Sequence, residues 1–123
     1  NSLMSLGYTL LSQNLHSMVE TVGLHTHFGN LHLPQKNAQP MVEASRLVAV
    51  KIARGWQRRR FYEAFVAGLN EAEARSAETQ TWIEFAVMAH YLDAETGQEI
   101  FAKYEEILAN LRRLIDNADA WTF

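Results

Sequence analysis

One stripe of residues at alternating spacings of four and three runs through the second half of the chain. Its members are Phe65, Leu69, Ala72, Ser76, Thr79, Ile83, Ala86 and His90. This heptad spacing keeps one face of an α-helix against neighbouring helices. It predicts a helix over residues 58–92, about 50 Å long at a rise of about 1.5 Å per residue. A helix of that length in a short chain needs other helices alongside it, so the stripe favours a helical bundle.

Three further segments carry the same helical periodicity. The first lies within residues 11–22, and the last follows Asp93 and Gly97. The second begins near Pro40, which suits a first turn because proline has no N–H to lose, and ends at Gly55, which suits a left-handed stop. Four helices with short connections predict an all-α fold, an antiparallel up-down four-helix bundle that forms one domain over residues 1–123.

Composition narrows the class of protein further. The 123 residues are 48% hydrophobic, which is enough for one folded domain and too much for intrinsic disorder. No run reaches the roughly 18–20 apolar residues of a membrane span, and we expect neither a signal peptide nor a membrane partner. The absence of cysteine excludes disulfides, thiolate zinc sites and a cysteine nucleophile, and it suits a cytoplasmic location.

A second apolar stripe borders the first near the end of the long predicted helix. Its members are Trp82, Phe85, Ala89 and Leu92. A helix with two apolar faces is either central in a bundle or shared with another subunit. Together with the aromatic residues Trp121 and Phe123, this second stripe predicts a homo-oligomer.

The net charge of −3 is unevenly distributed along the chain. Residues 1–62 carry seven Lys or Arg and two Asp or Glu, whereas residues 63–123 carry four and twelve. Five basic residues form a group that we call the basic junction: Lys51, Arg54, Arg58, Arg59 and Arg60. Such a group suits RNA or DNA, an acidic partner, or the acidic half of a neighbouring subunit.

The three consecutive arginines of the basic junction open the predicted long helix, where the helix dipole disfavours positive charge. Partners outside the helix therefore have to compensate them, either phosphates or the acidic residues of a neighbour. Trp56 precedes them and has two interpretations, stacking on a base or packing as an anchor at the helix junction.

Several polar residues at helical spacing are interpreted as structural and not as catalytic. Glu71 and Arg75 are four residues apart, which predicts an ordinary ion pair along one helix. Glu78 lies next to the apolar stripe and is predicted to pair with a basic residue of another helix. Thr96 and Glu99 have the spacing of a capping box at the start of the last helix.

Histidine is the residue type that most suggests a metal site. His25, His27 and His32 cluster between the first two predicted helices, but no carboxylate lies between Glu20 and Glu43 to complete a ligand set. We therefore interpret the three histidines as solvent-exposed loop residues.

Catalytic and metal-binding motifs are absent from the sequence. Ferritin-like bundles use Glu-x-x-His pairs, but Gln13 and Val87 take the glutamate position before His16 and His90. His90, on the heptad stripe, is predicted to be a capped or partly buried core residue. No nucleophile elbow, phosphate loop or dinucleotide fingerprint occurs. We therefore expect no catalytic, cofactor-binding or metal residue, and no enzymatic activity.

Two segments carry a family resemblance. They are the run VAVKIARG at residues 48–55, followed by Arg58 and Arg59, and the run ARSAETQTWIEFA at residues 74–86. In content, order and separation they resemble a bacterial family of four-helix-bundle proteins named for intervening sequences in 23S ribosomal RNA genes. Lys51 and Arg54 depart from the family pattern, which usually has Asn and Glu at these positions.

The resemblance implies an up-down bundle that assembles as a ring, commonly a pentamer, in a family with no established enzymatic activity. The related accessory variability determinant proteins of diversity-generating retroelements look like nucleic-acid-binding partners of a reverse transcriptase that use a basic ring surface, and the resemblance implies the same type of function as an alternative. The pI of about 5.9 is lower than is typical of that branch.

We therefore expect a non-enzymatic homo-oligomer, with a pentamer favoured, that acts through assembly and partner binding and uses no cofactor. The alternative is a nucleic-acid-binding accessory protein, for example a partner of a retroelement reverse transcriptase. In either case the predicted contact residues are those of the basic junction.

Overall fold

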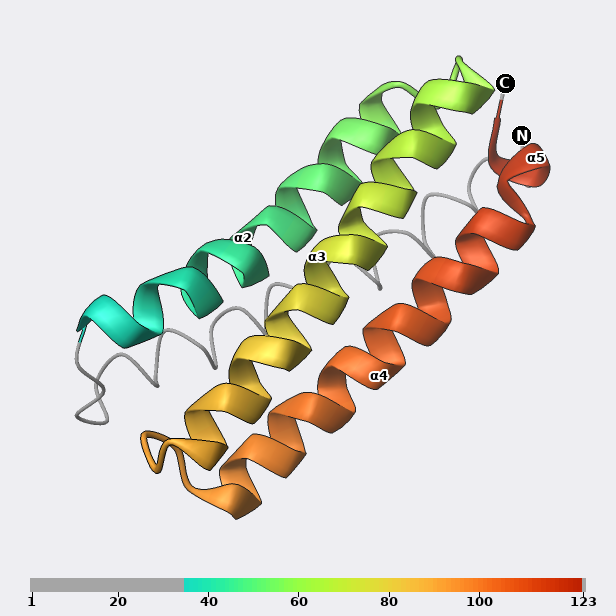
Figure 1. Ribbon diagram of the computed structural model, residues 1–123. Coiled ribbons are helices and arrows are strands. Elements are labelled where there is room, and N and C mark those ends of the chain that lie inside the picture. Colours follow the sequence, from blue (N-terminus) through green and yellow to red (C-terminus); the bar gives the residue numbers. More distant parts are fainter. Residues whose placement is uncertain (1–34, 123) are drawn as a thin grey trace.

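The computed structural model describes residues 35–122, which form four α-helices (Figure 1). They are α2 (Gln35–Gln57), α3 (Tyr62–Met88), α4 (Ala94–Asp116) and the single turn α5 (Ala118–Trp121). No strand occurs in this part of the chain. The first predicted helix, the histidines His25, His27 and His32, and Phe123 lie outside the described residues.

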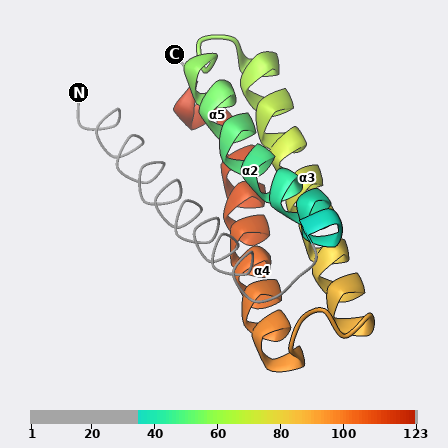
Figure 2. The same cartoon turned by 90° about the vertical axis from the view of Figure 1, so that its left-hand side faces the viewer.

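The three long helices lie side by side, and α3 contacts both α2 and α4 (Figures 1 and 2). The α2–α3 turn lies at one end of this arrangement and the α3–α4 turn at the other, so the chain reverses direction at both turns (Figure 1). None of the helices in residues 35–122 is long and apolar enough to cross a membrane. The helical fold class expected from the sequence is confirmed for this part of the chain.

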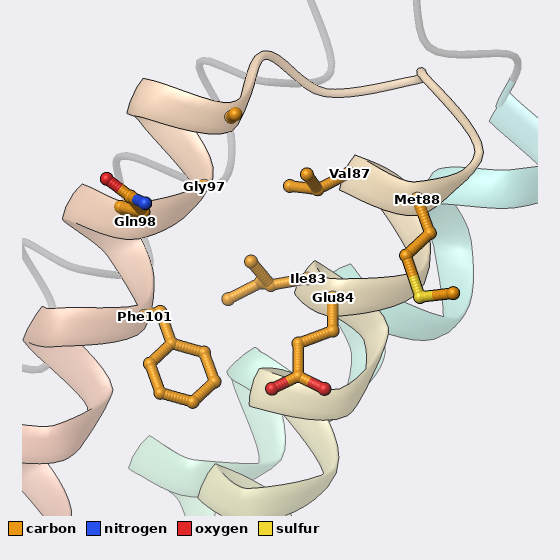
Figure 3. Close-up of a pocket in the computed structure, with 8 residues that line it drawn as sticks. Ile83, Glu84, Val87, Met88, Gly97, Gln98 and Phe101 are labelled. Carbon is orange, nitrogen blue, oxygen red and sulfur yellow. The ribbon is translucent and has the colours of Figure 1, made fainter.

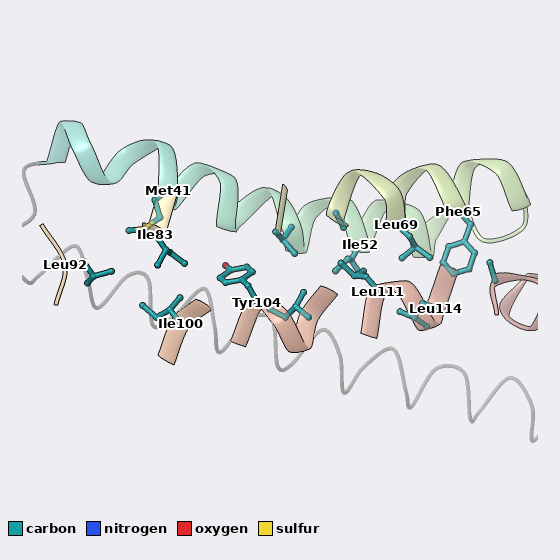
Figure 4. Close-up of a cluster of buried hydrophobic side chains, with 14 residues drawn as sticks. Met41, Ile52, Phe65, Leu69, Ile83, Leu92, Ile100, Tyr104, Leu111 and Leu114 are labelled. Carbon is teal, nitrogen blue, oxygen red and sulfur yellow. The ribbon is translucent and has the colours of Figure 1, made fainter. Parts of the chain in front are cut away.

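The heptad stripe forms the buried face of α3. Six of its members are at most 1% exposed: Phe65, Leu69, Ala72, Ser76, Thr79 and Ile83. The hydroxyl groups of Ser76 and Thr79 donate to the backbone oxygens of Ala72 and Arg75, each at 2.8 Å. Their polar groups are thereby satisfied within the helix itself. Figure 4 shows side chains of α2 and α4, such as Met41 and Leu111, gathered in the same core.

A tyrosine is buried in the middle of this core. Tyr104 of α4 is 1% exposed. Burial raises its pKa, and the hydroxyl side chains of Ser45 on α2 and Thr79 on α3 oppose that shift by smaller amounts. Side chains from all three long helices therefore meet around this ring.

Two glycines bring α2 and α3 together near their shared turn. A Cβ atom on Gly68 would lie 2.7 Å from the Cα atom of Gly55 and 3.2 Å from the backbone oxygen of Lys51. No side chain fits there, so the two backbones are in direct contact. Gly55 is therefore a packing residue. The prediction that it ends the helix is wrong, since α2 continues to Gln57.

Helix boundaries at the first turn also differ from the predictions. α2 includes Pro40 as an interior residue, at the cost of one backbone hydrogen bond. α3 begins at Tyr62 because residues 58–61 form a turn. In that turn the N–H of Phe61 donates to the backbone oxygen of Arg58 at 2.9 Å.

Asp93 caps the N-terminus of α4. Its side chain accepts hydrogen bonds from the backbone N–H of Thr96 at 3.1 Å and from the hydroxyl group of Thr96 at 2.8 Å. These bonds lower the pKa of Asp93 because they favour its charged form. The predicted capping box of Thr96 and Glu99 is therefore wrong: α4 begins at Ala94, and Asp93 is the cap.

Candidate interaction surfaces

The structure gathers the basic junction around the α2–α3 turn. Its members lie on the last two turns of α2 or in the turn itself: Lys51, Arg54, Arg58, Arg59 and Arg60. The sequence predicted that the three consecutive arginines form the first turn of the long helix. This prediction is wrong, because they precede α3, which begins at Tyr62. They nevertheless lie near its N-terminal end, where the helix dipole disfavours positive charge.

Lys51 forms an ion pair with another residue of the same chain. Its Nζ atom lies 2.7 Å from Oε2 of Glu71 on α3. The hydrogen bond and the positive charge of Lys51 lower the pKa of Glu71. The predicted pair of Glu71 with Arg75 is therefore wrong. Arg75 pairs instead with Glu78 on the same helix, at 2.9 Å, so Glu78 does not make the predicted pair with another helix.

Arg59 is also engaged within the chain. Its guanidinium group lies 4.1 Å from the ring centroid of Trp56, and its Nη1 atom donates to the backbone oxygen of Trp56 at 3.3 Å. Trp56 in turn packs edge-on against the buried Phe65, with ring centroids 6.3 Å apart. Of the two interpretations of Trp56, the structure supports the packing anchor.

The other three arginines are exposed to solvent beside two exposed aromatic rings. Arg54, Arg58 and Arg60 form no ion pair with a carboxylate of residues 35–122. Phe61 is 67% exposed and Tyr62 is 46% exposed. We call these five residues the basic end of the molecule. The sequence analysis identified the arginines but not the two aromatic residues, although both directly follow the arginine run.

A groove lies between α3 and α4 at the opposite end of the molecule. Its volume is about 430 Å³ and its lining is mostly apolar. The lining residues are Ile83, Glu84, Val87, Met88, Ala94, Gly97, Gln98 and Phe101. In Figure 3, Ile83 and Val87 of α3 point towards α4, and Phe101 of α4 lies across from them. Gly97 leaves room for this arrangement, because a Cβ atom there would overlap the side chain of Val87.

Exposed apolar and acidic side chains surround this groove. Met88 is 74% exposed, Phe85 is 55% exposed and Tyr91 is 43% exposed. Four carboxylates are also exposed: Glu84 lines the groove, and Asp93, Glu95 and Glu99 are sequence neighbours of its lining residues Ala94 and Gln98. We call the groove with these seven side chains the acidic end. The sequence analysis found Phe85 through the second apolar stripe but missed Met88 and Tyr91, which lie outside the stripes.

His90 lies at the acidic end, in the α3–α4 turn. It is exposed, and its backbone has a φ of 61°. The prediction of a core position is wrong because α3 ends at Met88, before the heptad stripe reaches His90. No three His, Asp or Glu side chains within residues 35–122 converge on a point that could hold a metal ion.

The comparisons with known proteins bear on the fold and the family. Residues 13–113 match the sequence profile of the family described as 23S rRNA-intervening sequence protein. A crystal structure of a protein of unknown function from the S23 ribosomal protein family of Bacteroides thetaiotaomicron is similar, with a TM-score of 0.73 and 20% sequence identity. The similarity covers 86% of this chain and 97% of that protein. No curated protein matches the chain.

Proposed function

We propose that this chain, which belongs to the 23S rRNA-intervening sequence protein family, is a non-enzymatic protein that acts through self-assembly and partner binding. In this proposal it is an antiparallel up-down four-helix bundle that forms a homo-oligomer in the cytoplasm, with a pentameric ring favoured. The observation that carries the proposal is the exposure of large apolar side chains at both ends of α3. Exposed apolar side chains that are grouped in this way are typical of protein–protein contacts.

The distribution of these side chains supports assembly more strongly than their number. Among residues 35–122, six large apolar residues are exposed, and five of them lie at the two ends: Phe61, Tyr62, Phe85, Met88 and Tyr91. Scattered single residues would need no explanation, whereas two groups suggest two contact surfaces. The chemistry of the groove also favours binding over catalysis, because Glu84 is the one ionisable residue among the described residues that line it.

Multi-angle light scattering of the purified chain tests the assembly. A pentamer would scatter as a particle of five times the 14.0 kDa mass of one chain, and native mass spectrometry would give the subunit number. A mass of one chain at every concentration would reject the proposal.

The basic end supports a second candidate function, a nucleic-acid-binding accessory protein such as a partner of a retroelement reverse transcriptase. The observation in its favour is the exposure of Arg54, Arg58 and Arg60, without an ion-pair partner in residues 35–122, beside Phe61 and Tyr62. Exposed arginines neutralise phosphates, and exposed aromatic rings stack on unpaired bases. Arg59 and Lys51 are secondary in this candidate because both have contacts within the chain.

A fluorescence anisotropy titration with labelled single-stranded RNA and DNA tests this candidate. Arg58→Glu with Arg60→Glu is expected to weaken binding by about tenfold or more at low salt, because two phosphate contacts become repulsive. Arg46→Glu with Lys103→Glu is the matched control, since both residues are exposed elsewhere on the molecule and the change in net charge is the same. Undetectable binding by the unchanged chain at low salt, or equal losses in the two variants, would reject the candidate.

A further inference from the structure

The groove between α3 and α4 is a short channel whose two walls the chain itself ties together. The wall on α3 lies within residues 83–88 and the wall on α4 within residues 94–101, so each wall is about 8–10 Å long. One turn further along α3, the side chain of Gln80 donates to the backbone oxygen of Phe101 at 3.3 Å and to Oε1 of Glu105 at 2.7 Å. These bonds join α3 to α4 beside the groove, so the two walls are positioned before any occupant enters.

The inner surface of the groove suits apolar side chains of a helix. Ile83 and Val87 point towards α4 (Figure 3), and Met88, which is 74% exposed, stands at the rim. Methionine adapts its shape to apolar side chains of different form and is common at surfaces that bind helices. A hollow between two neighbouring helices accepts residues that recur at i, i+3 and i+4 on a third helix. The length of the walls allows for about two turns of such a helix.

The border of the groove is acidic and has no cation of its own. Glu84 lines the groove, Glu95 lies in the first turn of α4, and Glu105 lies one helical turn beyond Phe101. None of these three carboxylates belongs to an ion pair of residues 35–122. Lys103 is near in sequence, but it is two residues from Phe101 and therefore lies on a different side of α4.

The helix ends at this site also favour a cation from outside. The partial positive charge at the N-terminus of α4 is met by Asp93 and Glu95. The partial negative charge at the C-terminus of α3 is not met in the same way, because the last turn of α3 contains no basic residue. A Lys or Arg side chain of a partner would therefore interact favourably with both the carboxylates and the end of α3.

We propose that this groove binds a basic amphipathic helix of another protein. Apolar side chains on one face of that helix insert between α3 and α4, and Lys or Arg residues on its flanks face Glu84, Glu95 and Glu105. This inference rests on the partner binding of the proposed function and names the chemistry of the partner.

Charge selects this occupant over others. Nucleic acid or an anionic lipid surface would bring more negative charge against the carboxylates. Residues 1–34 contain no Lys or Arg, so that segment of the chain does not offer the complementary charge. The basic junction lies at the other end of α3, which has 27 residues, and a separation of about 40 Å keeps it from the groove of its own chain. An apolar helix face flanked by Lys or Arg matches both the lining and the border.

A fluorescein-labelled synthetic peptide of leucine and lysine, with leucine at positions i, i+3, i+4 and i+7, is the probe. One control peptide has the same composition in an order without an apolar face, and another has glutamate in place of lysine. Fluorescence anisotropy with the full chain at low salt is expected to show at least about tenfold tighter binding of the probe than of either control, because only the probe combines apolar burial with opposite charge.

A charge variant of the protein tests the acidic border. Glu84→Lys with Glu95→Lys is expected to weaken probe binding by about tenfold or more at low salt, because attractive contacts become repulsive, and the difference should shrink as salt is added. Glu43→Lys with Asp116→Lys is the matched control, since all four residues are exposed and the change in net charge is the same. Circular dichroism verifies that both variants fold.

An apolar variant tests the rim. Met88→Ser is expected to weaken probe binding by about fivefold, because the contact of Met88 with the leucine side chains is lost. Val50→Ser is the matched control, since Val50 is the one exposed large apolar residue, among those described, that lies at neither end. It is expected to bind the probe like the unchanged chain.

The alternative outcomes separate this inference from the proposed function. Equal losses in the two charge variants, a control peptide that binds as tightly as the probe, or unchanged binding by Met88→Ser would overturn the inference. Light scattering of the same variants identifies a second copy as the occupant if the assembly is lost in Met88→Ser but retained in Val50→Ser, and this result would also overturn it. A probe that does not bind the unchanged chain would reject the inference and leave the proposed self-assembly standing.

Discussion

The two turns that flank α3 both join antiparallel neighbours, but the helices pack tightly at the α2–α3 turn and leave a groove at the α3–α4 turn. At the α2–α3 turn, Gly55 and Gly68 let the helix backbones touch. At the α3–α4 turn, the helices leave a groove of about 430 Å³ although Gly97 also lacks a side chain. The difference lies in what faces each glycine: backbone at the first turn and the tip of Val87 at the second.

The comparison shows how packing decides where apolar residues are exposed. At the tight turn, Phe61 and Tyr62 lie between the end of α2 and the first turn of α3, outside the buried core, and are exposed. At the open turn, Phe85 and Met88 lie on the outer side of α3, beyond the buried stripe. Both turns therefore expose apolar surface, but for different reasons, and each reason can be tested by substitution.

The largest expected contrast is between Phe65 and Phe85, which lie near the two ends of α3. Phe65 is 0% exposed and Phe85 is 55% exposed. Phe65→Ala should lower the free energy of unfolding by about 3–5 kcal/mol, because it leaves a cavity in the core. Phe85→Ala should change it by about 0.5 kcal/mol or less, as is usual at a surface. Urea denaturation followed by circular dichroism measures both, and equal losses would contradict the core assignment.

A smaller contrast is expected between the glycines of the two turns. In Gly68→Ala the new methyl group meets the backbone of Gly55, which cannot move without separating α2 from α3. The expected loss is about 1–3 kcal/mol, as for other overpacked sites. In Gly97→Ala the methyl group meets a side-chain tip, and the gain in helix propensity of up to about 1 kcal/mol offsets the clash. Thermal unfolding of the two variants should therefore rank Gly68→Ala as the less stable, and the reverse order would contradict the packing described for the first turn.

The smallest effect is expected at Asp93, the cap of α4. The hydrogen bonds from Thr96 lower its pKa in the folded state, so the stabilisation is present above the ordinary pKa of aspartate. It is lost as the pH falls through the lowered value. Asp93→Ala should lower the melting temperature at neutral pH, and the difference from the unchanged chain should shrink as the solution is made strongly acidic.

Asp93→Asn is the informative companion, because asparagine caps a helix without titrating. It should keep most of the stability at neutral pH and remove the dependence on acid. Glu106→Ala, at an exposed position within α4, is the control for loss of a carboxylate. If Asp93→Asn were as unstable as Asp93→Ala at neutral pH, the hydrogen bonds with Thr96 would not be the source of the stabilisation.

Much of the fold was predictable because a heptad stripe is a local property of the chain. Phe65 to Ile83 recur at a spacing that only a helix converts into one face, and these residues are buried as expected. The stripe did not indicate where the helix stops. His90 continues the spacing, yet α3 ends at Met88. The periodic pattern could not predict this end, because it carries no information about the turn that follows the helix.

Charge pairs and glycines were predicted less well because their roles depend on residues distant in sequence. Glu71 has Arg75 one helical turn away, but it pairs with Lys51 of α2. Gly55 has the local features of a helix end, but it is needed inside α2 because Gly68 lies against it. In both cases the deciding partner belongs to another helix and cannot be found from neighbours in the chain.

The sequence by itself determined the helical class, the buried face of α3 and the group of basic residues near the first turn. Periodicity and local charge suffice for these properties. Only the tertiary structure decided which basic residues are engaged within the chain and which remain exposed, and that the acidic segment borders an apolar groove at the far end of α3. These properties depend on how α2, α3 and α4 pack, since packing alone brings together side chains from different helices.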